Sequence, residues 1–260
     1  MTTVISALAE AVAPYEGWVP AIVAAAFASG FTRGFMGFGG AMVFVPATAA
    51  ILGPPVAVAC IWFFDLVIQI PLLLRALRHA VWREIAALAL AAMAFTPPGV
   101  AILVLADRDV LRWMICALIL IAVGVLAAGW RPARAPGTAG QVGIGALAGL
   151  FGGAAGIPGP PVIIFYLTSG KSAVQVRANL IVFFSTTTVV SGLSYWGAGL
   201  LTREAAVLSA ILVIPFALGT WLGARAFPLA GERNYRRIGF GLIVLVALVS
   251  LPAFDRMFGR

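Results

Sequence analysis

The sequence has few charged residues, one histidine and two cysteines. Charged residues make up 10% of its 260 residues and hydrophobic residues 62%, whereas ordinary globular domains contain roughly 25% and roughly 45–50%. A water-soluble domain of this length cannot bury so much apolar surface. The composition therefore excludes a soluble enzyme of normal make-up and a disordered chain, and we predict that lipid surrounds much of the protein.

The scarce residue types also limit the kinds of site. Cys60 and Cys116 each lie in an apolar run without the spacing of a metal site or a redox pair, so we expect both to be buried. His79 lies in a basic loop beside Trp82, where an interfacial role is expected rather than catalysis. No buried histidine, cysteine or carboxylate pair is arranged for chemistry, so we predict no enzyme, cofactor or metal.

The 17 basic and 9 acidic residues give a net charge of +8. In a soluble domain this excess would suggest nucleic acid. Here the basic residues cluster between apolar runs, so we predict no nucleic-acid partner and interpret the charge as a sign of membrane orientation and of an anionic substrate. A cleavable leader needs a basic start, and the first 18 residues contain no lysine or arginine, so none is expected.

Apolar runs long enough to cross a membrane occur throughout the chain. A spanning helix needs about 20 mostly apolar residues. Two long runs are broken by glycine or proline, which are poor residues for a helix interior. Each broken run is interpreted as two short helices, which form either two thin spans or a re-entrant hairpin. The other runs are expected to form helices at 56–77, 85–106, 111–130, 174–202, 204–226 and 235–254.

The two broken runs are similar to each other. A shift of 119 residues places Gly30 on Gly149 and Gly34 on Gly153, and Pro97 resembles Pro215 in a later helix. We therefore predict an all-α polytopic membrane protein of two repeats, each a glycine-rich broken hairpin followed by three transmembrane helices. The first repeat covers 18–130 with its hairpin at 18–52, a basic linker covers 131–140, and the second repeat covers 141–254 with its hairpin at 141–170.

Each repeat has an odd number of unbroken helices, so the second is predicted to lie upside down relative to the first. With both termini outside the cytoplasm, twelve of the 17 lysine and arginine residues face the cytoplasm. This distribution agrees with the positive-inside rule, and we predict extracytoplasmic N and C termini. The five outward-facing residues are Arg108, Arg112, Arg203, Arg256 and Arg260.

The broken hairpins indicate an anion site. A helix that stops within the membrane leaves backbone N–H groups without partners, and the start of a helix carries partial positive charge. We expect a small anion between the two hairpin tips, beside Gly39 and Gly40 in one and Gly156 and Gly159 in the other. Close helix packing is the alternative use of these glycine-rich segments.

Polar residues within the apolar runs are further candidates. Arg33 precedes the first break and is expected to bind the anion, with an interfacial anchor as the alternative. Arg177 either reaches the site or extends to the interface, while Asn179 lies deeper and offers amide donors. Asp65 and Gln69 share a helix face, and Asp65 either pairs with a buried arginine or carries a proton.

Hydroxyl groups follow in the helix after the second hairpin. Ser185 and Thr188 share a stripe with Arg177 and could line a path for the anion. Their hydroxyls bonding to carbonyl groups one turn back is the alternative. Tyr195 and Trp196, near the end of that helix, are expected in the interfacial aromatic belt.

Three segments together resemble a known family. Ala28–Gly40 reads ASGFTRGFMGFGG, Gly149–Pro161 reads GLFGGAAGIPGPP, and the basic triplet Arg177–Asn179 follows. They resemble the sulfite exporter TauE/SafE family of membrane permeases, and the resemblance extends over almost the whole chain. The prolines of the second segment depart from the first, so the two hairpins are expected to contribute unequally.

The resemblance implies a transporter of the bacterial inner membrane that exports sulfite or an organosulfonate such as sulfoacetate by alternating access. An importer of sulfate, thiosulfate or another small anion is the alternative, while a membrane enzyme and a structural subunit explain the polar breaks less well. The expected partners are the small anion, the lipid bilayer and, for a bundle this small, a second copy of the chain.

Overall fold

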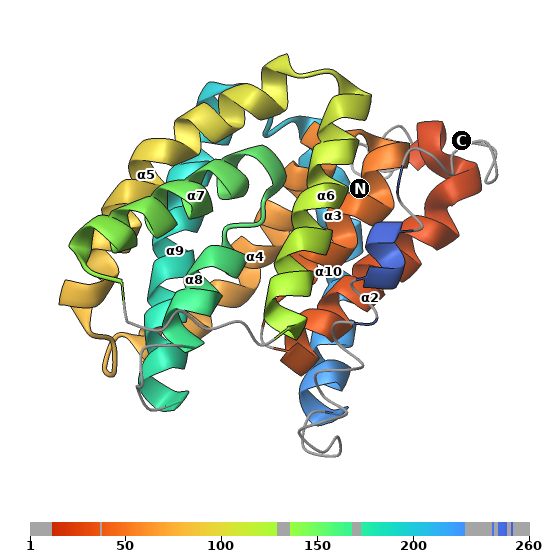
Figure 1. Ribbon diagram of the computed structural model, residues 1–260. Helices are drawn as coiled ribbons and strands as arrows, with labels where there is room; N and C mark the ends of the chain where they lie inside the picture. The colour runs from red at the N-terminus through yellow and green to blue at the C-terminus, as the bar shows by residue number, and fades with distance from the viewer. Residues whose placement is uncertain are drawn as a thin grey trace. The chain divides into compact units, whose positions relative to one another are not determined.

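The computed structural model describes residues 12–36, 38–128, 136–167, 173–226, 241, 244–248 and 251. In this part of the chain the regular elements are all helices, so the predicted helical fold class is confirmed there. Figure 1 shows η1 (Ala13–Trp18), α2 (Val19–Met36), α3 (Gly40–Leu52), α4 (Pro54–Ala76), α5 (Trp82–Leu105), α6 (Arg108–Ala127), α7 (Thr138–Ala155), α8 (Gly159–Leu167), α9 (Ala173–Gly197) and α10 (Arg203–Ala226).

Several helix ends differ from the sequence prediction. The segment 138–140, predicted as linker, belongs to the first turn of α7. α9 ends at Gly197, before the predicted end at 202, and Gly199 in the turn that follows has a φ of 70°. Most of the predicted last helix, 235–254, and residues 131–135 of the predicted linker lie outside the described residues.

Three helices in the described part of the chain are long and apolar enough to cross a membrane. They cover Trp82–Leu105, Ala178–Gly197 and Arg203–Ala226. Their outer faces carry large exposed apolar side chains, such as Leu90 at 65% and Ile214 at 69% exposure. Water disfavours apolar surface of this kind, whereas lipid hydrocarbon does not, so these faces suit a bilayer.

The described helices form two compact units that do not coincide with the two halves of the sequence. Unit 1 is drawn from Met1–Phe64, Ala106–Ile121 and Gly199–Arg260, and unit 2 from Asp65–Leu105 and Ala122–Ala198. In unit 1 the first hairpin, α2 and α3, packs on α10. In unit 2 the second hairpin, α7 and α8, packs with α5 and α9. Each hairpin therefore contacts a long helix from the other half of the chain.

In unit 1 the backbones of α2 and α10 lie in close contact, as Figure 1 shows. A Cβ at Gly30 would overlap the carbonyl oxygen of Phe216, and a Cβ at Gly34 would overlap that of Thr220. Small residues four apart are how membrane helices reach such a distance. Close packing was the alternative role of the glycine-rich hairpins, and Gly30 and Gly34 of α2 have this role. Gly219 and Gly223 of α10 have it as well.

Unit 2 repeats this packing between α7 and α5. A Cβ at Gly149 would overlap the carbonyl oxygen of Ala92, and a Cβ at Gly153 would overlap that of Thr96. Glycine on α5 contributes as well, because a Cβ at Gly99 would overlap the carbonyl oxygen of Leu150. The same backbone contact therefore holds the first arm of each hairpin.

The contacts in the two units correspond to each other. Each hairpin residue lies 119 positions from its counterpart, and each residue of the long helix lies 124 positions from its counterpart. The internal similarity therefore includes tertiary contacts as well as glycine spacing. The matched pairs are Gly30–Phe216 with Gly149–Ala92, Gly34–Thr220 with Gly153–Thr96, and Gly223–Phe31 with Gly99–Leu150.

Two threonines extend this correspondence. The hydroxyl of Thr96 donates a 2.7 Å hydrogen bond to the carbonyl group one turn back, and Thr220 does the same at 2.8 Å. Since the contacts match Thr96 with Thr220, Pro97 and Pro215 occupy different positions in the two packings. Their predicted match is wrong because the register follows the glycine contacts rather than the prolines.

Candidate anion site

The first hairpin breaks at Gly39. This residue precedes α3 and has a φ of 89° and a ψ of 0°, a left-handed conformation that a Cβ disfavours. α3 contains 13 residues and is about 20 Å long, which is less than the roughly 30 Å of a hydrocarbon core. When one end of α3 lies at a membrane surface, the other end must lie inside the bilayer.

Arg33 lies beside the start of α3. A Cβ on Gly40 would come within 3.4 Å of the Arg33 Cβ and 3.3 Å of the Ser29 Oγ. Ser29 is buried, and its hydroxyl donates a 2.8 Å hydrogen bond to the carbonyl group of Gly40. The structure therefore brings Arg33, Gly39 and Gly40 together. It adds Ser29, which was not among the predicted site residues although it lies one helical turn before Arg33.

The second hairpin breaks at Gly156, which has a φ of 67°. The N–H of Gly156 donates to the carbonyl of Gly152 at 3.0 Å, and the N–H of Ile157 donates to the carbonyl of Phe151 at 3.2 Å. A left-handed glycine whose N–H donates to the carbonyl group four residues back is a common end of an α-helix. α8 follows from Gly159, contains 9 residues and is therefore about 14 Å long.

The starts of α3 and α8 differ in what they offer an anion. Pro160 and Pro161 occupy the first turn of α8, as predicted, and neither has a backbone N–H. Gly152 corresponds to Arg33 under the 119-residue shift, and a Cβ there would lie 3.1 Å from the Cβ of Pro158. The first hairpin therefore combines more N–H donors with a positive side chain, and the second has fewer donors at its helix start.

Asn179 is fully buried and contacts the segment that leads into α5. Its Oδ1 accepts a 2.9 Å hydrogen bond from the N–H of Val81, and its Nδ2 lies 3.4 Å from Glu84 Oε2. The side chain thus joins α9 to the start of α5 within unit 2. Asn179 therefore has a structural role, and its role in anion binding stays a prediction.

Tyr195 does not lie in an interfacial belt, contrary to the prediction, because its side chain is only 1% exposed. Its hydroxyl donates a 2.9 Å hydrogen bond to the carbonyl of Gly152, in the last turn of α7 beside the second break. Since a helix end inside a protein must find partners for its last carbonyl groups, Tyr195 stabilises that end. No local pattern in the sequence indicates this long-range partner.

The remaining predicted residues belong to α4 and α9. Gln69 is buried at 6% exposure and Asp65 is half-buried. The hydroxyl of Ser185 donates a 2.9 Å hydrogen bond to a carbonyl group one turn back, as the alternative reading expects. Thr188 is half-buried, and the side chain of Arg177 lies outside the described residues. A polar path along these residues stays a prediction.

The predicted site residues divide between the two units. Unit 1 contains Arg33, Gly39 and Gly40, which lie together at the first break. Unit 2 contains those of the second break and of the polar face: Gly156, Gly159, Asp65, Gln69, Arg177, Asn179, Ser185 and Thr188. Each unit therefore has one broken hairpin with a left-handed glycine at its break.

Comparison with known proteins agrees with this arrangement. The chain is 29% identical over 228 residues to a protein of Cupriavidus necator named "Probable sulfite/organosulfonate exporter TauE", and the match covers 84% of this chain and 88% of that protein. No solved structure matches. The family described as "Sulfite exporter TauE/SafE" matches residues 22–250, which include the breaks of both hairpins. The protein thus belongs to the sulfite exporter TauE/SafE family of membrane transporters.

Proposed function

We propose that this transporter exports a small sulfur-containing anion, sulfite or an organosulfonate such as sulfoacetate, across the bacterial inner membrane. Its family and the name of its Cupriavidus relative support this substrate class. The observation that carries the proposal is the position of Arg33 beside the start of α3, next to the left-handed Gly39. A positive side chain and the N–H groups of a helix start suit an oxyanion.

In this proposal the first hairpin binds the anion more strongly than the second. Arg33 and the N–H groups that follow Gly39 and Gly40 contact the oxyanion. Gly156 and Gly159 of the second hairpin also contribute to anion binding, with fewer donors because of the prolines of that hairpin. Residues of α4 and α9 assist or line the path: Asp65, Gln69, Arg177, Asn179, Ser185 and Thr188.

Transport proceeds by alternating access between two inverted repeats. The matching contacts of α2 with α10 and of α7 with α5 support two equivalent halves. One charge moving through 100 mV is worth about 2.3 kcal/mol, which is a concentration ratio of roughly fiftyfold. An anion that leaves a negative interior moves down this potential, so export needs no coupled ion.

Replacing Arg33 by alanine tests the proposal. We expect Arg33→Ala to reduce sulfite efflux from loaded proteoliposomes by at least about tenfold, because a hydrogen bond to a charged group is worth roughly 1.5–3 kcal/mol. Arg33→Lys keeps the charge and should retain part of the efflux. Arg78→Ala, which removes the same charge from the exposed loop after α4, should transport as the wild type does.

Efflux by Arg33→Ala at the wild-type rate would remove Arg33 from the site. The same vesicles decide between substrates and directions. Faster uptake of sulfate or thiosulfate than efflux of sulfite, measured with the same protein orientation, would favour the importer. Melting temperatures of the variants in detergent separate a loss of transport from a loss of folding.

A further inference from the structure

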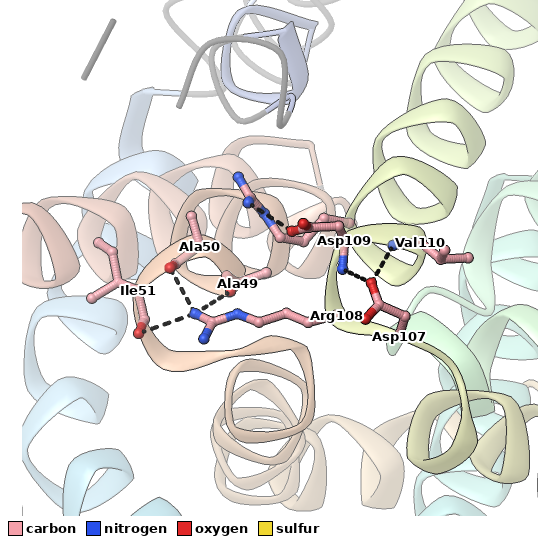
Figure 2. Close-up of polar contacts among 8 residues, drawn as sticks. Ala49, Ala50, Ile51, Asp107, Arg108, Asp109 and Val110 are labelled. Carbon is pink, nitrogen blue, oxygen red and sulfur yellow. Dashed lines mark hydrogen bonds and ion pairs between the residues drawn. The ribbon is translucent and has the colours of Figure 1, made fainter. Parts of the chain in front are cut away.

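The far end of α3, opposite its Gly40 start, is closed by an arginine from another helix. Arg108 Nη2 donates a 2.7 Å hydrogen bond to the carbonyl group of Ala50 and lies 3.4 Å and 3.5 Å from the carbonyl oxygens of Ala49 and Ile51. Figure 2 shows the Arg108 side chain extending toward these three oxygens. Three of the last four carbonyl groups of α3 therefore face one guanidinium group.

The position of Arg108 is fixed by the start of α6. Asp107 Oδ1 accepts hydrogen bonds from the N–H of Asp109 at 2.8 Å and of Val110 at 3.4 Å, which closes the first turn of that helix. A positive side chain in the first turn of a helix is disfavoured by the dipole of that helix. The carbonyl groups of α3 account for an arginine at this position.

The charge of Arg108 lies at the C-terminal end of α3. A helix end carries about half a negative charge on its last carbonyl groups, and this negative end opposes the positive potential at the helix start. A cation bound at the last carbonyl groups neutralises the negative potential of that helix end. This charge effect falls off within the last turn of the helix, so at Gly40, at the other end of the 13 residues, Arg108 acts by holding α3 in place.

We propose that Arg108 is a positioning residue for anion binding: it fixes α3 at its C-terminal end and raises the affinity of the α3 start for the anion, without touching the anion. This inference rests on the proposed function, since it assigns the anion to the start of α3. The three contacts with Arg108 hold the C-terminal end of α3 in place while its other end contacts the anion.

Binding of sulfite to the purified full-length protein tests this role. Arg108→Gln removes the charge but keeps an amide donor for the Ala50 carbonyl, and we expect the Kd for sulfite to rise roughly fivefold. Arg108→Lys keeps the charge and should bind within about twofold of the wild type. The matched control is Arg203→Gln, which removes an exposed charge from the first turn of α10 in the same unit and should leave the Kd unchanged.

Each result has one meaning. An unchanged Kd in Arg108→Gln, an equal loss in Arg203→Gln, or a loss in Arg108→Lys as large as in Arg108→Gln would each overturn the inference. If Arg108→Gln is not recovered folded, Arg108→Lys decides, because a rise well above twofold contradicts the role of the charge. A wild-type protein that binds no sulfite would instead overturn the proposed substrate, which is a different outcome from binding that ignores Arg108.

Discussion

The hydrogen bond between Tyr15 and Glu204 joins two segments of unit 1 that are 189 residues apart. The Tyr15 hydroxyl donates to Glu204 Oε1 at 2.7 Å, which connects η1 to the first turn of α10. Partial burial, followed by the bond to Glu204 and the charge of its carboxylate, raises the pKa of Tyr15 to about 12. Since the neutral phenol is the form that bonds the carboxylate, this contact makes stability depend on pH.

The pH dependence has a definite sign. Because the pKa of Tyr15 rises on folding from 10.0 to about 12, its contribution to stability is complete below pH 10 and is lost as the pH rises toward 12. The difference between the ultraviolet titrations of wild type and Tyr15→Phe should show one phenol with a midpoint near 12. Glu204→Gln should lower that midpoint. A midpoint near 10 would mean that the bond to Glu204 does not persist in solution.

At the scale of the helices, α7 contains glycines in two different surroundings. A Cβ at Gly149 would overlap the backbone of α5 at Ala92, whereas nothing lies within 4 Å of a Cβ at Gly143. The two residues belong to one helix and have the same intrinsic helix propensity. Their difference therefore depends only on what packs against each of them.

Two alanine substitutions measure this difference. Gly149→Ala should lower stability by about 1–3 kcal/mol, because α5 and α7 must move apart to accept the methyl group. Gly143→Ala should be neutral or stabilising by up to about 1 kcal/mol, since alanine favours the helix. The measurement is the apparent melting temperature in detergent. Equal melting temperatures for the two variants would contradict the close contact of α5 and α7.

At the scale of the whole molecule, each compact unit combines a hairpin from one half of the sequence with a long helix from the other. This exchange means that neither half of the sequence can complete its packing alone. If the two repeats are inverted as we propose, loops at corresponding places must lie on opposite sides of the membrane. The loop 77–81 between α4 and α5 corresponds to the loop 198–202 between α9 and α10.

Single cysteines in these loops test the inversion. In a Cys60→Ala, Cys116→Ala background, His79→Cys and Ala198→Cys each place a thiol at an exposed position. We expect a membrane-impermeant maleimide to label position 198 in intact cells and position 79 only after the membrane is opened. Labelling of both positions from the same side would show that the repeats are parallel, while the reverse pattern would place both termini in the cytoplasm.

The amino-acid sequence determined the helices and their breaks, because these depend on local chemistry. Long apolar runs form helices whatever their neighbours are, and proline in a first turn begins a helix at Gly159. The breaks at Gly39 and Gly156 follow from glycine's access to positive φ. The sequence also indicated Arg33 as a candidate anion ligand, since a cation next to a helix break within an apolar run suggests an anion site.

Only the tertiary structure decided which glycines turn the chain and which pack. Gly30 and Gly39 are chemically identical, yet one lies against Phe216 and the other has a φ of 89°. The pairing of Tyr195 with Gly152 and of Arg108 with Ala50 was likewise absent from any local pattern. These contacts join residues between 43 and 186 positions apart. Their free energy depends on how the helices pack, which periodicity and spacing along one segment do not encode.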